Sequence, residues 1–184
     1  GAFGDGGAIF CQDEKLASEL KMIANHGQKE KYVHERIGIN SRLDTLQAAI
    51  LNVQLKYLPT VIARKQAIAA RYDAGLANIT GLSIPFRDIK SSHVFHQYTL
   101  RITNRRAELK KYLAEAGIDT MVYYATPMHL QKAYASSAHP AGTFPIAEQL
   151  SKEVLSIPIH TTLTDEEIDF VIQKIKDFFA GDIA

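Results

Sequence analysis

One stretch of this chain, residues 26–51, carries the side chains best suited to hold an anion. It reads HGQKEKYVHERIGINSRLDTLQAAIL. Asn40 offers two amide N–H donors and Arg42 offers a guanidinium fork, which are groups that bind phosphate or carboxylate. Ser41 followed by Asp44 has the spacing of a helix-capping pair, so we expect a helix from about residue 42. The free N–H groups at the start of such a helix would favour an anion.

The same residues have a simpler structural interpretation. Asparagine often precedes a helix as a cap or turn residue, and arginine in a first helical turn is usually solvated. From the residues alone, phosphate binding near Asn40 and a purely structural role both stay open.

Two other groups could contact a ligand. His26 stands beside Gly27 at the expected end of a helix, where an imidazole can cap the helix or reach a ligand. Tyr123 and Tyr124 close an expected strand before a loop rich in Pro, His and Tyr over residues 125–140. The pair is either a half-buried aromatic edge or a pocket wall with a phenol donor. Loops of this length are often functional.

Other kinds of site find little support. The chain has seven histidines and one cysteine, Cys11. No two histidines stand four apart in an expected helix, and one cysteine cannot form an internal disulfide or a cysteine-based metal cluster, so we expect no metal site. We expect Cys11 to be a small apolar strand residue rather than a nucleophile. No Ser-His-Asp set or carboxylate pair stands out.

Composition describes an ordinary globular protein. The 184 residues are 46% hydrophobic, and 21 Lys and Arg balance 20 Asp and Glu to a net charge of +1. This length supports one domain or slightly more. Without a basic run, nucleic-acid binding is not expected. No stretch approaches the ~20 apolar residues of a membrane span and no signal-peptide pattern opens the chain, so we expect no membrane contact and a cytoplasmic location.

Periodicity indicates the elements that position these side chains in the first third of the chain. We expect a short strand at residues 8–11 whose partner strands lie outside this chain, and a helix capped by Asp13 that ends near Gly27. A polar loop should follow over residues 28–38. The long helix after it carries two apolar stripes, and Pro59 interrupts it, so we expect a kink or a restart and a domain boundary there.

After Gly81 the pattern is that of a small α+β unit. We expect strands at residues 82–84, 94–102, 119–124 and 156–159. Three helices should alternate with them: one capped by Asn104, one beginning at Pro145, and a last one after the capping box of Thr164 and Glu167.

Several motifs together resemble the DegT/StrS family of nucleotide-sugar aminotransferases, which are pyridoxal 5′-phosphate (PLP) enzymes of the aspartate aminotransferase fold. The motifs are GDGGAIF at 4–10, HG at 26–27, GINSRLDTLQAAIL at 38–51, Tyr-Tyr-x-x-Pro-x-His-Leu-Gln at 123–131, and the strand end Ile-Pro-Ile-His. The resemblance spans essentially all 184 residues. It implies a partial α/β PLP-transferase fold of type I. Residues 1–58 would be the last strand and helices of the large PLP-binding domain with the linking helix, and residues 59–184 the small α+β C-terminal domain.

The resemblance also implies roles for individual residues. Asn40 would contact the cofactor phosphate of a partner subunit's site in a homodimer that shares its active sites. Arg42 would bind cofactor in the same pocket, and His26 would face substrate there. Tyr123 and Tyr124 match an aromatic pair that approaches the sugar nucleotide. The residue after this pair is alanine where the family often has proline, which is a departure on the sugar side.

In the family, the lysine that forms the Schiff base with PLP lies just before the GDGG turn. The resemblance therefore places it upstream of Gly1, with no catalytic residue in this chain, which alone should be inactive. The implied function is amination of a nucleotide-linked keto-sugar for surface polysaccharide or amino-sugar biosynthesis, with an amino donor such as glutamate. One alternative is a dehydratase of the same fold that uses pyridoxamine phosphate and has histidine in place of the lysine. A non-catalytic dimerisation module is the other.

Overall fold

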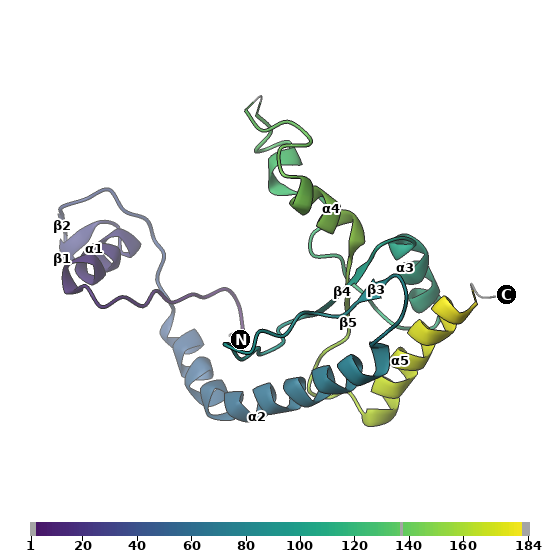
Figure 1. The fold of residues 1–184 in the computed structure, drawn as a ribbon. Helices are drawn as coiled ribbons and strands as arrows, with labels where there is room; N and C mark the ends of the chain where they lie inside the picture. Colours follow the sequence, from purple (N-terminus) through teal and green to yellow (C-terminus); the bar gives the residue numbers. More distant parts are fainter. Residues whose placement is uncertain (1–2, 137, 182–184) are drawn as a thin grey trace. The chain divides into compact units, whose positions relative to one another are not determined.

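The computed structural model describes residues 3–136 and 138–181, and the chain separates into two compact units, Gly1–Pro59 and Thr60–Ala184 (Figure 1). Helix α2, Thr45–Leu76, runs through this division with Pro59 inside it. The helix does not restart at the proline, and the alternative expectation of a kink there stays a prediction. Pro59 removes only one hydrogen-bond donor, and the helical turns on both sides continue. The domain boundary that we expect in the complete protein stays a prediction.

The first unit is built on helix α1, Glu14–Ala24, followed by an antiparallel pair of strands, β1 (Gln28–Glu30) and β2 (Val33–His34). The predicted cap is confirmed, because a carboxylate oxygen of Asp13 accepts the backbone N–H groups of residues 15 and 16 at 2.9 and 3.0 Å. The expectation of a loop over residues 28–38 is wrong, since this segment holds the hairpin. Its strands are polar, so hydrophobic alternation gave no signal for them.

The strand expected at residues 8–11, with its partners outside this chain, stays a prediction. These residues are extended and pair with no strand in the described part of the chain, and a strand depends on a partner for its backbone hydrogen bonds. Ile9 and Phe10 are exposed, Phe10 to 90%. Within residues 3–59 only Gly27 is fully buried, so the first unit has no hydrophobic core of its own.

The second unit contains the core. Three antiparallel strands lie in the order β3 (Leu82–Ser83), β4 (Tyr98–Ile102), β5 (Val154–Ile157). Helix α3 (Arg106–Glu115) packs against α5 (Asp165–Ala180) and β5, while α4 (Pro145–Glu153) contacts β4 (Figure 1). The short 3₁₀ helix η1, Met128–Leu130, precedes α4. The core side chains come from the second half of α2, the sheet, α3 and α5, and include Ile68, Tyr72, Leu100, Leu113, Leu155 and Ile175.

The sequence predictions for this unit have mixed outcomes. The capping box of Thr164 and Glu167 is confirmed, with both reciprocal bonds present. The predicted cap at Asn104 is wrong: the residue before α3 is Arg105, which has a left-handed backbone (φ 65°) and makes no side-chain cap bond. The strand expected at residues 119–124 reduces to one isolated bridge between Met121 and Ser156.

The strand expected at residues 94–102 begins only at Tyr98, because Phe95 has a positive φ of 48° that no strand accommodates. A polar cluster holds this turn. Asp73 accepts hydrogen bonds from the Tyr98 hydroxyl (2.6 Å) and from Arg87 (2.7 Å), and the Arg87 guanidinium lies 4.2 Å from the Phe95 ring centre. Burial, with Asp73 as a further cause, raises the pKa of Tyr98, so the phenol stays protonated as the donor.

None of the helices in the described part of the chain combines the length and the apolar character needed to cross a bilayer.

Candidate functional site

Residues 38–41 are held by the end of helix α1. An isolated bridge joins Asn25 and Asn40. The backbone hydrogen bonds run from His26 N–H to Ile39 O (2.9 Å), from Ile39 N–H to Ile23 O (2.8 Å) and from Ser41 N–H to Ala24 O (2.9 Å). Backbone pairing with the end of α1 therefore fixes the position of Asn40. The same set of hydrogen bonds includes His26, through its backbone N–H.

This arrangement corrects the expectation of a helix start at residue 42. Helix α2 begins at Thr45, so Asn40 and Arg42 both lie in the extended segment before it. Ser41 uses its backbone N–H to pair with α1 instead of offering its side chain as a cap. The free N–H groups at the start of α2 are thus not placed to bind an anion near Asn40. An anion site there must depend on side chains.

Two glycines make the close approach of these segments possible. Gly27 has a left-handed backbone (φ +73°), and a Cβ at this position would lie 1.8 Å from the Arg36 carbonyl oxygen. A Cβ on Gly38 would lie 2.2 Å from the Gly27 nitrogen. Neither position has room for a side chain, which explains why residues 27 and 38 are glycines.

Arg42 fixes the orientation of the Asn40 amide. Its Nε donates a hydrogen bond to Asn40 Oδ1 at 3.0 Å. Because Nε can only donate, it selects the amide oxygen, and the two N–H donors of Asn40 Nδ2 are left for another partner. The terminal nitrogens of Arg42 make no hydrogen bond or ion pair within the described residues. The pair therefore presents donors only, which fits a phosphate group.

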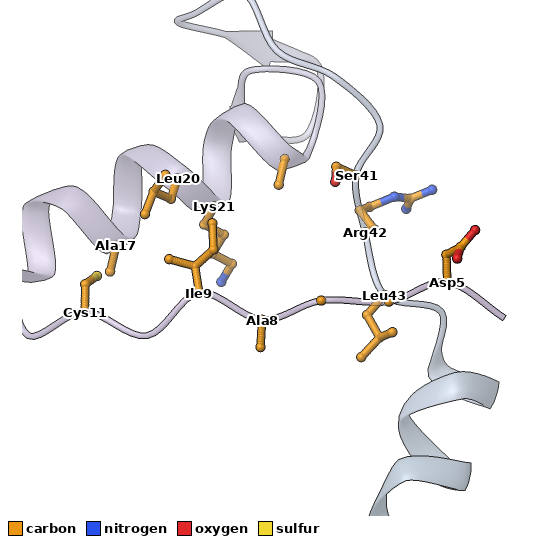
Figure 2. Close-up of a pocket in the computed structure, with 13 residues that line it drawn as sticks. Asp5, Ala8, Ile9, Cys11, Ala17, Leu20, Lys21, Ser41, Arg42 and Leu43 are labelled. Atoms are coloured by element: carbon orange, nitrogen blue, oxygen red, sulfur yellow. The ribbon is translucent and has the colours of Figure 1, made fainter. Parts of the chain in front are cut away.

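A pocket of about 740 Å³ lies next to this pair (Figure 2). It is formed by the extended segment 5–11, one face of α1 with Ala17, Leu20 and Lys21, and residues 41–43. Figure 2 shows the side chain of Ile9 pointing toward α1 and that of Arg42 pointing away from it. Of the predicted site residues, Arg42 lines this pocket, whereas Asn40 and His26 do not.

His26 takes part in the site through its backbone. It has a left-handed conformation (φ 60°), and its carbonyl oxygen lies 2.9 Å from the Nδ1 atom of His34 at the end of the hairpin. The His26 side chain is exposed. His26 thus closes the turn after α1 while its ring stays accessible.

Tyr123 and Tyr124 lie in the second unit, beside a pocket of about 640 Å³. Their ring centres are 5.6 Å apart in an edge-to-face arrangement, and Tyr124 is 75% exposed. The pocket is mainly apolar and is also lined by residues of the loop before α4 and of α4 itself, including Pro127, His129, Phe144 and Leu150. Both tyrosines therefore line a pocket, while the role of their hydroxyl groups toward a ligand stays a prediction.

Sequence reasoning missed a polar pair at this wall, made by His129, which lines the pocket, and Glu148, which does not. His129 Nε2 lies 2.9 Å from Glu148 Oε1, and the side chains are only 8% and 17% exposed. The same oxygen accepts the backbone N–H of Gly142 at 2.7 Å. Nothing local to either residue predicts the pair, because 19 residues separate them in the chain. In residues 3–136 and 138–181, no three His, Cys, Asp or Glu side chains gather where they could hold a metal ion.

Comparison with known proteins gives consistent matches along the chain. Residues 2–176 match the model of the DegT/DnrJ/EryC1/StrS aminotransferase family. The sequence is 42% identical over 178 residues to the dTDP-3-amino-3,4,6-trideoxy-alpha-D-glucose transaminase of Streptomyces venezuelae, covering 97% of this chain and 47% of that protein. It is 40% identical over 171 residues to the UDP-2-acetamido-2-deoxy-3-oxo-D-glucuronate aminotransferase of Pseudomonas aeruginosa, covering 93% of this chain and 46% of that protein.

The X-ray structure of S. venezuelae DesV in complex with a ketimine intermediate matches with a TM-score of 0.93 and 41% identity, over 97% of this chain and 48% of that one. This match confirms the fold class predicted from the sequence, an incomplete α/β fold of the PLP-dependent aminotransferase type. The chain spans about half the length of the relatives that it matches.

Proposed function

Because this chain belongs to the DegT/DnrJ/EryC1/StrS aminotransferase family, we propose that it is part of a PLP-dependent enzyme that aminates a keto-sugar carried on a nucleotide. The relatives support this substrate class, since one name specifies a dTDP-linked 3-amino sugar and the other a UDP-linked 3-oxo sugar. Glutamate is the amino donor that we propose, and we place the reaction in the cytoplasm.

The observation that carries the proposal is the donor arrangement of Asn40 and Arg42. Arg42 holds the amide oxygen, so Asn40 Nδ2 and the terminal nitrogens of Arg42 are the atoms available to a phosphate dianion. These residues would hold the cofactor through its phosphate. When bound, PLP supplies the electron sink that makes amino-group transfer possible.

The rest of the site is divided between subunits in this proposal. Asn40 serves the cofactor site of a partner subunit in a homodimer, with His26 near the substrate. Tyr123 and Tyr124 line the pocket that receives part of the sugar nucleotide. The Schiff-base lysine lies outside this chain, which leaves to these residues the tasks of binding and orienting.

The test is a product assay with the full-length protein, PLP and glutamate. Nucleotide-linked 3-keto and 4-keto sugars, each as the dTDP and the UDP form, are supplied separately. We expect one of them to yield an aminated sugar nucleotide and an equal amount of 2-oxoglutarate, measured by mass spectrometry and a coupled assay. Reactions without keto-sugar are the control. Loss of water from a sugar without release of 2-oxoglutarate would instead favour the dehydratase, and no conversion of any sugar would refute the proposal.

A further inference from the structure

The contacts of Glu148 point to a function for this residue that nothing above assigns. We propose that Glu148 is a positioning residue, which orients the His129 ring and ties the loop before α4 to that helix, so that one wall of the Tyr123–Tyr124 pocket is formed in advance.

A single carboxylate oxygen joins three parts of the chain. Oε1 of Glu148, in the first turn of α4, lies 2.9 Å from His129 Nε2 in η1 and 2.7 Å from the N–H of Gly142 in the loop between them. The edge of the Phe144 ring packs against the same imidazole, with ring centres 4.9 Å apart and planes at 72°. His129 is therefore held from two directions, and η1 is joined to the first turn of α4.

The protonation of the pair follows from its chemistry. The hydrogen bond from His129, followed by that from Gly142, lowers the pKa of Glu148 below its ordinary value, so the carboxylate is ionised near neutral pH and can only accept. Nε2 of His129 must then carry a proton. In the neutral ring, Nδ1 is consequently the nitrogen with the lone pair.

This orientation decides what His129 can offer to a ligand. The residue lines the pocket, and Nε2 is already used by Glu148, so a hydrogen bond to a ligand must come from Nδ1. Within the described residues Nδ1 has no partner. When the ring is neutral, the lone pair of Nδ1 selects a donor, such as a sugar hydroxyl or the imide N–H of a pyrimidine base. The identity of that ligand rests on the proposed function, whereas the orientation of the ring does not.

The experiment reads the tautomer directly. In the 184-residue chain labelled with ¹⁵N-histidine, nitrogen chemical shifts distinguish the Nε2–H from the Nδ1–H form, and the signal of His129 is identified by its loss in His129→Asn. We expect the Nε2–H form in the wild-type chain. Glu148→Ala should yield a mixture of tautomers, and Glu148→Gln, which keeps an acceptor oxygen, should restore the Nε2–H form.

Glu153→Ala is the matched control. It removes a carboxylate of the same helix that pairs with Arg101, and it should leave the His129 signal unchanged. An Nδ1–H form in the wild-type chain would overturn the proposal even if the variants fail to fold. Equal tautomer shifts in Glu148→Ala and Glu153→Ala would also overturn it, because they would indicate general destabilisation. The measurement needs neither cofactor nor sugar, so its outcome is independent of the product assay.

Discussion

Arg42 determines which end of the Asn40 side-chain amide is available to a ligand. Both side chains are exposed, and a single hydrogen bond at 3.0 Å joins them. An exposed bond of this kind contributes about 0.5–1.5 kcal/mol, so it adds little to stability. Its value lies in orientation, since a flipped amide would turn its oxygen toward a phosphate.

Substitutions of Asn40 test this orientation. In the full-length protein, Asn40→Ala removes two donors, and we expect PLP to bind roughly 10-fold more weakly, as for the loss of one hydrogen bond to a charged group. Asn40→Asp can still accept from Arg42 but turns a negative charge toward the phosphate, so it should bind PLP more weakly still. The measurement is a titration followed by PLP absorbance.

Pyridoxal, which lacks the phosphate, is the control ligand for this series. Its affinity should be the same in wild type, Asn40→Ala and Asn40→Asp. Equal PLP affinity in all three proteins would remove Asn40 from the cofactor site.

Helices α2 and α5 pack closely against each other at a glycine. Gly75 lies inside α2, and a Cβ there would lie 2.7 Å from both Cδ1 and Cγ2 of Ile172 on α5. Alanine gains about 1 kcal/mol over glycine in a helix, whereas overpacking a core costs about 1–3 kcal/mol. Ile172 is buried and branched at Cβ, so it has little freedom to move. The packing term should win, and the two helices are close because residue 75 is a glycine.

We therefore expect Gly75→Ala to lower the free energy of unfolding by about 1 kcal/mol in urea denaturation. Ile172→Val removes the Cδ1 methyl group and should relieve part of the clash. The double variant should accordingly be more stable than the sum of the single effects predicts. A stabilised Gly75→Ala protein would mean that helix propensity dominates and that α2 and α5 can separate at little cost.

Several elements defined by local interactions could be predicted from the sequence, although the caps expected at Asn104 and at Ser41 are absent. The cap at Asp13, the capping box at Thr164 and the helix beginning at Pro145 depend on residues within one turn of each other, and all three are present. Strands were predicted less well because pairing is not local. The hairpin after α1, for example, pairs without an apolar pattern.

The candidate site shows the same difference between local and non-local interactions. Asn40 and Arg42 could be predicted as donors to one anion from their chemistry, whereas their mutual hydrogen bond was not predicted and their expected place at a helix start is wrong. The contact between His129 and Glu148 needed the folded loop to become visible. The roles of His26, Tyr123 and Tyr124 toward a substrate stay predictions.

At the scale of the whole molecule, the two units differ in how they are stabilised. Every buried hydrophobic side chain in the described residues lies at Ile68 or beyond, in the second unit. The first unit is held by backbone pairing and by glycine contacts, and large apolar side chains such as Phe10, Ile37 and Leu46 are exposed in it. The chain spans about half the length of its relatives. Exposed apolar side chains in the first unit are compatible with the proposal that its residues serve a shared site.

The measurement that tests this central claim most directly is complementation between two impaired variants of the full-length protein, assayed at a PLP concentration that saturates the wild type but not Asn40→Ala. One carries Asn40→Ala, and the other has its Schiff-base lysine replaced. Each has its own affinity tag, so the mixed dimer can be purified over two columns. If Asn40 serves the partner's site, the mixed dimer contains one intact site and should show about half of the wild-type activity. If Asn40 serves the site of its own subunit, or if no mixed dimer forms, no activity above that of the parent variants will appear, and the shared site is refuted.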